Sequence, residues 1–321
     1  MALQDAFDQF LMVKDLEGLR ERTLSDHKTH FKYFQDYLER ANIKLTYLDE
    51  VTPQICRGYV LFMKNKKHKW DNHQHLSEVD PVKGLSPVTI NIRIRSLKAQ
   101  FNFYVKEGFS PSNPWEAVPL LKTDKSEINA FSKEELAQLL RTPNKSTFVG
   151  FRDYVLMIAL LDTGCRISEL LSINEESVDF EDGVIYIGAS KAKTRFGRPV
   201  PVSPKTIDLI KNLIKENRIL EDRDNTAIFI TVSGNRLTDS DARRILSTYG
   251  KKANIKHVRV SPHTMRHTFA KHYILSGGDP FTLKEILGHS TLEMTKKYIS
   301  MKIDDLKHQH NQFSLMKSNA I

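Results

Sequence analysis

The residues best suited to chemistry lie in the segment Ser261–His267, which reads SPHTMRH. Ser261 fits the N-cap position of a helix, and Pro262 fits the first helical position, where a fixed φ and a missing N–H are tolerated. His263 and Arg266 are three residues apart, so both side chains leave one face of the first turn. A helix N-terminus offers unpaired N–H groups and a positive dipole end, and arginine adds a planar bidentate fork. The segment therefore predicts a binding site for a phosphate oxyanion.

Other segments carry residues of the same chemical kind. Upstream, TGCRISEL places Arg166 directly after a glycine turn, and downstream LGH ends at His289, nine residues before Tyr298. Cleavage of a phosphodiester without water needs a nucleophile, cationic clamps for the phosphoryl oxygens, a base, and an acid for the leaving oxygen. A phenol with a pKa of about 10 can be that nucleophile only beside cations or a base. An arginine can equally serve an ion pair, and Asp162 and Glu169 are the nearby carboxylates for Arg166.

In this order, the segments resemble the catalytic signature of the tyrosine recombinase (phage integrase) family. Box I of that signature is an arginine after a glycine turn, box II is H-x-L-R-H, and an L-G-H and the nucleophilic tyrosine follow. Box II here reads HTMRH, in which Met265 replaces leucine with an apolar residue of similar volume. The resemblance is strong over residues 130–300 and looser over the N-terminal helices. It implies a Xer/integrase-like site-specific DNA recombinase, mainly α with a small β-sheet. A helical, SAM-like core-binding domain would precede a mixed α/β catalytic domain.

The resemblance implies a role for each matching residue. Tyr298 would attack the DNA phosphate, giving a covalent 3′-phosphotyrosyl intermediate and a free 5′-hydroxyl, and the reverse attack would reseal the strand without ATP. Arg166 and Arg266 would clamp the phosphoryl oxygens. His263 and His289 would hydrogen-bond those oxygens and assist proton transfer, and which of the two is the base stays open.

A lysine in the segment SKAKTRFGR would complete the set. In the family, a lysine in the loop of this hairpin protonates the leaving 5′-oxygen, as a general acid. Aligning the strand that follows, at residues 198–201, places Lys193 at that position, and Lys191 is the alternative.

No metal or cofactor is expected. His263 and His267 are four residues apart, as in a zinc helix, but the glutamate of H-E-x-x-H is absent. His267 completes the box II pattern but points away from the helix face shared by His263 and Arg266, so we assign it a structural role. The polar stretch over residues 65–84 contains three histidines without cysteines or a periodic scaffold, which favours a solvated loop over a metal site. The chain also contains neither a P-loop nor a G-x-G-x-x-G motif.

The charge balance favours a polyanionic partner. The 321 residues include 48 lysines and arginines against 39 aspartates and glutamates, a formal net charge of +9. No apolar run approaches the ~18 residues of a membrane span, and the N-terminus is acidic where a signal peptide is basic. The two cysteines, Cys56 and Cys165, give neither a disulfide framework nor a metal spacing. We expect a cytoplasmic enzyme that acts on double-stranded DNA with paired recombination sites.

Hydrophobic periodicity and turn residues divide the chain into two domains. Residues 1–110 read as helices with polar joints and form the expected core-binding domain. Residues 111–128 contain several prolines and a polar run, which indicate a linker. Residues 129–321 form the expected catalytic domain with its C-terminal tail. Two short strands at 184–187 and 199–202 would flank the hairpin lysine.

One helix of the first domain is expected to contact DNA. It begins at Ser86-Pro87, and its apolar residues recur on one side. Arg93, Arg95 and Lys98 occupy another part of its circumference, where they could follow phosphates. In the family, a helical N-terminal domain clamps one side of the duplex.

By analogy with the family, the two domains form a C-shaped clamp and four protomers assemble on two DNA sites. This homo-tetramer would be held by the C-terminal tail, residues 299–321, docking on the neighbouring protomer. Accessory DNA-bending proteins are further partners that the family allows. Two alternative functions are a type IB topoisomerase, which shares the tyrosine chemistry, and a DNA-binding regulator on a recombinase scaffold. Integration and excision of a mobile element and chromosome-dimer resolution are both compatible with the sequence.

Overall fold

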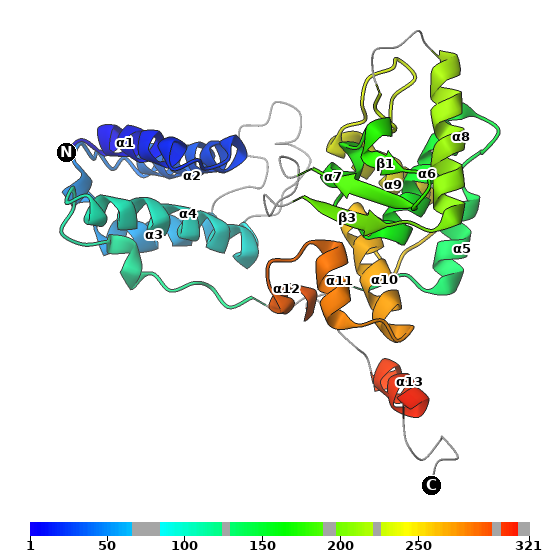
Figure 1. Ribbon diagram of the computed structural model, residues 1–321. Coiled ribbons are helices and arrows are strands. Elements are labelled where there is room, and N and C mark those ends of the chain that lie inside the picture. The colour runs from blue at the N-terminus through cyan, green and yellow to red at the C-terminus, as the bar shows by residue number, and fades with distance from the viewer. Residues whose placement is uncertain (66–83, 124–128, 189–196, 221–225, 297–302, 314–321) are drawn as a thin grey trace. The chain divides into compact units, whose positions relative to one another are not determined.

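The structure, a computed structural model, describes residues 1–65, 84–123, 129–188, 197–220, 226–296 and 303–313. The chain divides into two compact units, Met1–Lys125 and Ser126–Ile321 (Figure 1). The described part is mainly helical and contains one small sheet in the second unit, as the sequence predicts.

The first unit is a helical bundle around an aromatic core. Phe7 and Phe31 stack with ring centroids 3.9 Å apart, and Phe34 meets Trp115 edge-on at 5.5 Å. Offset and edge-to-face pairs of this kind add to the free energy gained by burying the rings. The elements are α1 (Leu3–Leu16), α2 (Glu21–Arg40), η1 (Leu48–Glu50), α3 (Pro53–Asn65), α4 (Pro87–Lys106) and η2 (Pro114–Ala117).

Part of the stretch expected to be a linker belongs to the first core. The η2 turn places Trp115 in that core with no exposed surface. Asn91 of α4 donates from Nδ2 to the carbonyl of Leu121 at 2.9 Å, and its Oδ1 accepts from the N–H of Leu121 at 2.8 Å. The segment from Pro114 to Leu121 therefore packs as part of the first unit.

The second unit combines helices with a three-stranded antiparallel sheet of order β1-β2-β3. Its strands are β1 (Val178–Asp179), β2 (Val184–Ile187) and β3 (Arg198–Pro201). Its helices are α5 (Lys133–Arg141), α6 (Phe148–Thr163), α7 (Ile167–Leu171), η3 (Glu175–Ser177), α8 (Pro204–Leu220), α9 (Asp239–Lys252), α10 (Pro262–Leu275), α11 (Pro280–Leu287), α12 (Leu292–Lys296) and α13 (Ile303–Phe313).

The sheet presents one face to the core of the second unit. Ile185, Ile187 and Val200 are almost completely buried, whereas Tyr186 on the opposite face is exposed. The pairing register sets Ile187 of β2 opposite Arg198 of β3, so the last strand begins one residue earlier than its sequence pattern indicates.

Local signals fix the ends of the helices that border the site. Ser261 accepts at Oγ from the N–H of Thr264 at 3.2 Å and caps α10, with Pro262 at the first helical position. Gly164 ends α6 in the left-handed region, at φ 59°. A Cβ on Gly164 would lie 2.3 Å from a ring carbon of Phe269, so α6 and α10 approach closely only because this residue is glycine.

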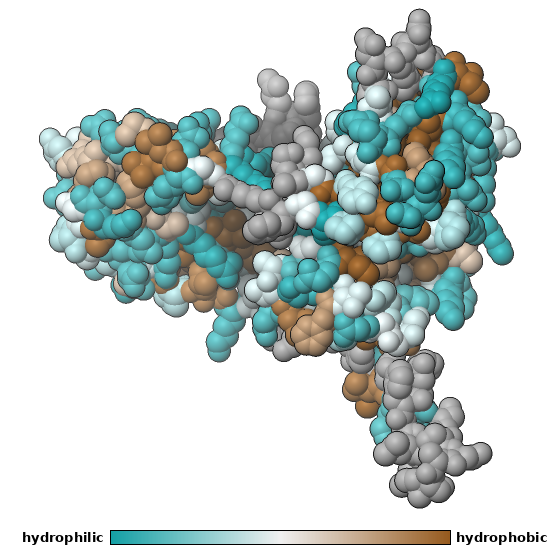
Figure 2. Space-filling model, viewed as in Figure 1, coloured by the Kyte–Doolittle hydropathy of each residue, from teal (hydrophilic) through white to brown (hydrophobic). Residues whose placement is uncertain are grey.

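No helix among the described residues is long and apolar enough to cross a membrane. Hydrophilic residues cover much of the visible face of both units, with smaller apolar patches between them (Figure 2).

Candidate active site

Four of the six predicted catalytic residues meet in the second unit. Arg166 is the N-cap residue of α7, His263 and Arg266 lie in the first turns of α10, and His289 follows the glycine that ends α11. Lys193, its alternative Lys191, and Tyr298 lie outside the described residues, as does most of the histidine-containing stretch over 65–84.

Arg266 is held by the ends of two helices. Its side chain is almost completely buried, and the residue is 3% exposed. Nη1 donates to the carbonyl of Gly164 at 2.8 Å, and Nη2 donates to the carbonyl of Leu287 at 2.8 Å. Both carbonyls lie at helix C-termini, where the negative pole of the dipole favours a cation. The guanidinium is therefore fixed before any ligand binds.

His289 supports Arg266 as a neutral imidazole. Its Nε2 lies 2.8 Å from Arg266 Nη2, and its Nδ1 lies 2.9 Å from Thr295 Oγ1. A guanidinium can only donate, so Nε2 must accept, and the ring proton is on Nδ1, which donates to Thr295. Burial, then the charges of Arg266, Arg166 and Arg198, lowers the pKa of His289 to about 3.

Arg166 is paired with Glu169, one of the two carboxylates that its sequence neighbourhood offered. Nη1 donates to Oε1 of Glu169 at 2.8 Å, and the backbone N–H of Arg166 donates to Oε2 at 2.9 Å. The other carboxylate, Asp162, instead accepts from the N–H of Ser203. Arg166 keeps 18% of its side chain exposed, so this arginine can still meet a ligand.

Arg198 was not predicted as a site residue, because its sequence context indicates only part of a strand. Its guanidinium donates to both oxygens of Glu169, at 2.8 and 3.3 Å, and its side chain is 10% exposed. Glu169 is thus shared by two arginines. No local sequence signal marks this arginine, because its partners come from other elements.

His263 differs from His289 in both exposure and contacts. It is an exposed residue that, with Arg166 and Arg266, lines a groove of about 790 Å³. Partial burial of the ring, followed by the charge of Arg266, lowers the pKa of His263, which favours its neutral form near pH 7. A neutral imidazole facing a groove can accept a proton.

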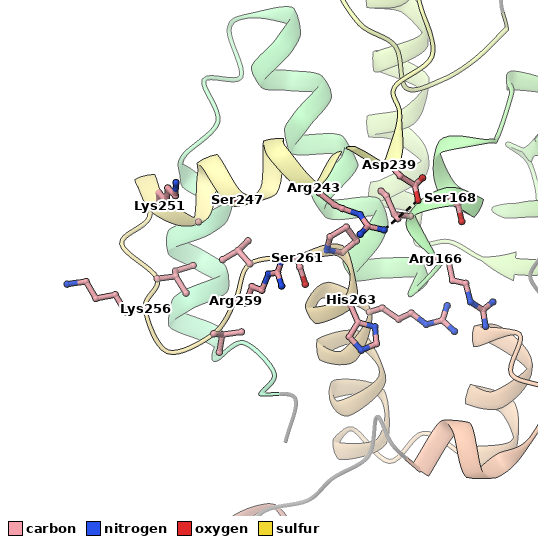
Figure 3. A pocket seen from close by; sticks show the side chains of 17 residues that line it. Arg166, Ser168, Asp239, Arg243, Ser247, Lys251, Lys256, Arg259, Ser261 and His263 are labelled. Atoms are coloured by element: carbon pink, nitrogen blue, oxygen red, sulfur yellow. Dashed lines mark ion pairs between the residues drawn. The ribbon is translucent and has the colours of Figure 1, made fainter. Parts of the chain in front are cut away.

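The groove continues away from these residues along α9 and the loop that follows it. Arg166 and His263 lie at one end, and Lys251 and Lys256 lie at the other (Figure 3). Arg243, on the wall between the two ends, is 3.8 Å from Asp239. A surface of this kind suits an extended polyanion better than a small molecule. Ser168, Ser247, Arg259 and Ser261 add to its polar lining.

The three expected phosphate contacts of the first unit have different surroundings. Arg95 is exposed and Lys98 is half-buried. Arg93 is instead 8% exposed, and its guanidinium carbon lies 3.9 Å from the centroid of the Tyr33 ring. Because α4 is buried on more than its apolar side, Arg93 packs within the unit, and this corrects its expected place on a phosphate-tracking face.

Within the described residues, no three His, Cys, Asp or Glu side chains gather where they could hold a metal ion. His267, which is expected to have a structural role, is 1% exposed.

Comparison with known proteins identifies the family of the chain. Residues 129–304 match the model of the phage integrase family, and residues 3–125 match that of the phage integrase SAM-like domain. The chain belongs to the phage integrase family. The resemblance noted in its sequence is thereby confirmed: it is a tyrosine recombinase, an enzyme that breaks and rejoins DNA.

Relatives match this recombinase over nearly its whole length. Tyrosine recombinase XerC of Thermodesulfovibrio yellowstonii is 28% identical over 305 residues, which cover 94% of this chain and 93% of the relative. Tyrosine recombinase XerD of Staphylococcus haemolyticus is 26% identical over 315 residues, which cover 97% and 99%.

The same fold occurs in two solved recombinase complexes. The Tn1549 transposon integrase bound to transposon right end DNA superposes on the recombinase with a TM-score of 0.72 at 22% identity, covering 98% of this chain and 99% of the integrase. The XerH recombinase bound to its difH substrate gives a TM-score of 0.65 at 21% identity, covering 89% and 78%.

Proposed function

We propose that this recombinase cuts and rejoins double-stranded DNA at paired, specific sites, with Tyr298 as the nucleophile and a 3′-phosphotyrosyl intermediate. The observation that carries the proposal is the convergence of Arg166 and Arg266 on one groove from two helices far apart in the chain. Two fixed guanidinium groups can bind two phosphoryl oxygens and stabilise the extra negative charge of a pentacoordinate transition state. Lys193 would protonate the leaving 5′-oxygen.

We assign the base to His263 and a supporting role to His289. His263 faces the groove, and its lowered pKa keeps it neutral near pH 7. His289 already uses Nε2 to accept from Arg266, and it is not among the residues that line the groove. Proton transfer requires a nitrogen within reach of the tyrosine hydroxyl, which favours the ring in the groove.

The path of the DNA in this proposal follows the basic wall of the groove. Arg243, Lys251, Lys256 and Arg259 would contact phosphates along the groove to one side of the scissile bond. In the first unit, Arg95 and Lys98 would contribute. The DNA in the solved complexes of the Tn1549 integrase and of XerH supports DNA as the partner of this chain.

The proposal includes a homo-tetramer assembled on two sites through the C-terminal tail. Helix α13 carries Ile303 and Leu306, which are 64% and 50% exposed and offer an apolar surface to a partner. Deleting residues 305–321 should abolish synapsis and recombination while DNA binding is retained, as measured by gel shift and by recombination of a two-site plasmid. Unchanged recombination by the truncated chain would contradict this role of the tail.

Trapping of a covalent adduct tests the proposed chemistry. DNA flanking the gene is cut into nicked substrates whose 5′-hydroxyl diffuses away after cleavage, and each is incubated with the protein without metal or ATP. We expect an adduct on a denaturing gel that Tyr298→Phe abolishes. Tyr186 is an exposed tyrosine on β2, so Tyr186→Phe is the matched control and should leave the adduct unchanged.

The other outcomes each favour a different function. An adduct that survives Tyr298→Phe would show that another tyrosine attacks. Tight, salt-sensitive binding without any adduct would favour a DNA-binding regulator. Relaxation of a supercoiled plasmid that lacks a recombination site would favour a type IB topoisomerase. The flanking sequence that is cleaved would distinguish a mobile-element site from a chromosomal one.

A further inference from the structure

Three arginines contact the C-terminal end of α11, one at each of three successive carbonyl oxygens, those of residues 286–288. Arg198 donates from Nε to the first at 2.9 Å, Arg266 from Nη2 to the second at 2.8 Å, and Arg166 from Nη2 to the third at 3.3 Å. Arg166 and Arg266 line the groove, whereas Arg198 does not. Arg198 therefore belongs to the same cluster but does not face the groove in which DNA is proposed to bind.

One buried carboxylate lies among these cations. Glu169 has no exposed surface, and it accepts two hydrogen bonds from the guanidinium of Arg198 and two from Arg166, one of them from the backbone N–H. Burial alone raises the pKa of Glu169, but the hydrogen bonds and charge of Arg198, followed by those of Arg166, lower it below its ordinary value. Glu169 is therefore ionised, and three guanidinium groups against one carboxylate leave two positive charges.

A phosphate in the groove would be sensitive to how the charge of Glu169 is balanced. An ionised carboxylate beside a phosphate-binding arginine repels the phosphate and competes for the guanidinium, and both effects are strong where water is excluded. Arg198 approaches Glu169 with a bidentate fork, the geometry in which arginine binds a carboxylate best. Its charge offsets that of Glu169 and leaves the charge of Arg166 for a ligand.

The backbone around Gly288 is built to admit Arg198. Gly288 ends α11 in the left-handed region, at φ 63°, and a Cβ there would lie 2.8 Å from Cζ of Arg198. The guanidinium thus packs flat against a residue without a side chain, directly before His289. Any residue other than glycine would push Arg198 away from the helix end or displace the turn.

We propose that Arg198 is a positioning residue for DNA cleavage. Arg198 offsets the negative charge of Glu169 from outside the groove and holds the turn at Gly288 in place. The charges of Arg166 and Arg266 then remain available to the scissile phosphate. This function differs from phosphate binding, proposed for Arg166 and Arg266, and from protonation of the leaving oxygen, proposed for Lys193. The inference rests on the proposed function, because it needs a phosphate to be cleaved in the groove.

The test measures the rate of covalent adduct formation by the full chain on a nicked substrate, at saturating protein. Arg198→Met should lower the rate about 10²-fold, the size of effect expected from a misplaced catalytic group. Arg198→Lys keeps the charge but loses the fork, so it should remain within about tenfold of wild type. Adding Glu169→Gln to Arg198→Met removes the unbalanced carboxylate and should restore the rate about tenfold.

A matched arginine–glutamate pair on the surface provides the control. Arg218 donates to Glu175 at 2.6 Å and is 70% exposed, so Arg218→Met and its combination with Glu175→Gln should leave the rate unchanged. DNA binding by gel shift and thermal unfolding are measured for every variant. If Arg198→Met does not fold, the Arg198→Lys variant and the double variant carry the test.

The outcomes separate the positioning role from the proposed function. An Arg198→Met variant as fast as wild type would overturn the inference alone. The inference would also be overturned if both Arg198→Lys and the double variant were as slow as Arg198→Met. That result would indicate a purely structural anchor, whose loss does not depend on the charge of Glu169. Absence of a Tyr298-dependent adduct from the wild-type chain would overturn the proposed function and this inference with it.

Discussion

The two units of this recombinase bury their arginines in different ways. In the first unit, Arg93 lies over the ring of Tyr33 among aromatic side chains. In the second unit, Arg152 pairs with Asp153, and Arg198 pairs with a buried glutamate. A ring face stabilises a cation through its quadrupole and needs no counter-charge, whereas a carboxylate neutralises the cation it binds.

The difference indicates what each core is for. The aromatic core of the first unit is stabilised by packing and carries few buried ions, so its energetics follow apolar area. The second unit buries carboxylates and cations together, and removal of one partner leaves an uncompensated charge. This arrangement is costly for stability, but it sets the charge of the groove with fixed groups.

The largest expected effect on stability comes from breaking the buried ion pair within α6. Asp153 is 2% exposed and accepts from Arg152 at 2.6 and 2.9 Å. Asp153→Ala should lower the free energy of unfolding by about 3–5 kcal/mol, because it leaves a buried guanidinium without its counter-charge. Urea unfolding followed by far-UV circular dichroism measures the loss, and Glu175→Gln, in the exposed pair, is the control.

Tryptophan fluorescence shows whether that loss is confined to the second unit. Of the two tryptophans, Trp115 is buried in the core of the first unit, and Trp70 lies outside the described residues. The unfolding transition that Trp115 reports should therefore stay in place in Asp153→Ala. An equal shift of the fluorescence transition would contradict the separation of the two cores.

A smaller effect should follow pH through His289. Its pKa is about 3 in the folded chain, and the ordinary value of about 6.5 applies when it is unfolded. As pH falls, the unfolded state takes up the proton first. The contribution of neutral His289 is therefore complete above pH 6.5 and is lost as pH falls from 6.5 toward 3. Between pH 6.5 and 5 this group alone should lower the free energy of unfolding by about 1.5 kcal/mol.

Comparison of wild type with His289→Gln isolates that contribution. The lowered pKa of His263 acts in the same direction, and the pKa of Asp153, raised by burial against the effect of Arg152, acts in the opposite direction. Both groups are present in both chains, so their effects cancel in the difference. Identical pH slopes in the two chains would show that His289 is not held neutral by its surroundings.

An effect of similar size contrasts two buried tyrosines. Tyr249 in the second unit donates its hydroxyl to Asp153 at 3.1 Å, so Tyr249→Phe should lower the free energy of unfolding by about 1–2 kcal/mol. The hydroxyl of Tyr104 in the first unit has no hydrogen-bond partner among the described residues. Tyr104→Phe should leave stability within about 1 kcal/mol of wild type or raise it, as measured by tryptophan fluorescence in urea. A larger loss for Tyr104→Phe would reverse the contrast.

The sequence was sufficient to predict helix ends and strands where the interacting residues are close together in the chain. Ser132 and Glu135 form the predicted capping box of α5, and Ser261 caps α10 as expected. These bonds join residues three apart, so the spacing in the sequence determines them. The run of β-branched and aromatic residues that begins at Val184 also predicts β2, because such residues favour strands.

Contacts between distant segments could not be derived in this way. Arg198 and the carbonyl it binds on α11 are 88 residues apart, and nothing near either residue marks the other. Trp115 stands among prolines that indicate a linker, yet its burial in the first core depends on helices far upstream. Arg93 has the spacing of a solvent-facing residue, but α4 is covered on more than one side. Family resemblance, rather than periodicity, is what predicted Arg166, His263, Arg266 and His289 as members of one site.

The hydrogen bond between His289 and Thr295 makes two parts of the enzyme geometrically dependent on each other. Thr295 is completely buried in α12, three residues before the proposed nucleophile in the chain. The imidazole of His289 accepts a hydrogen bond from Arg266 and also bonds to Thr295, in the helix that precedes Tyr298 in the chain. A protomer in which that segment is out of place also loses support for its arginine clamp.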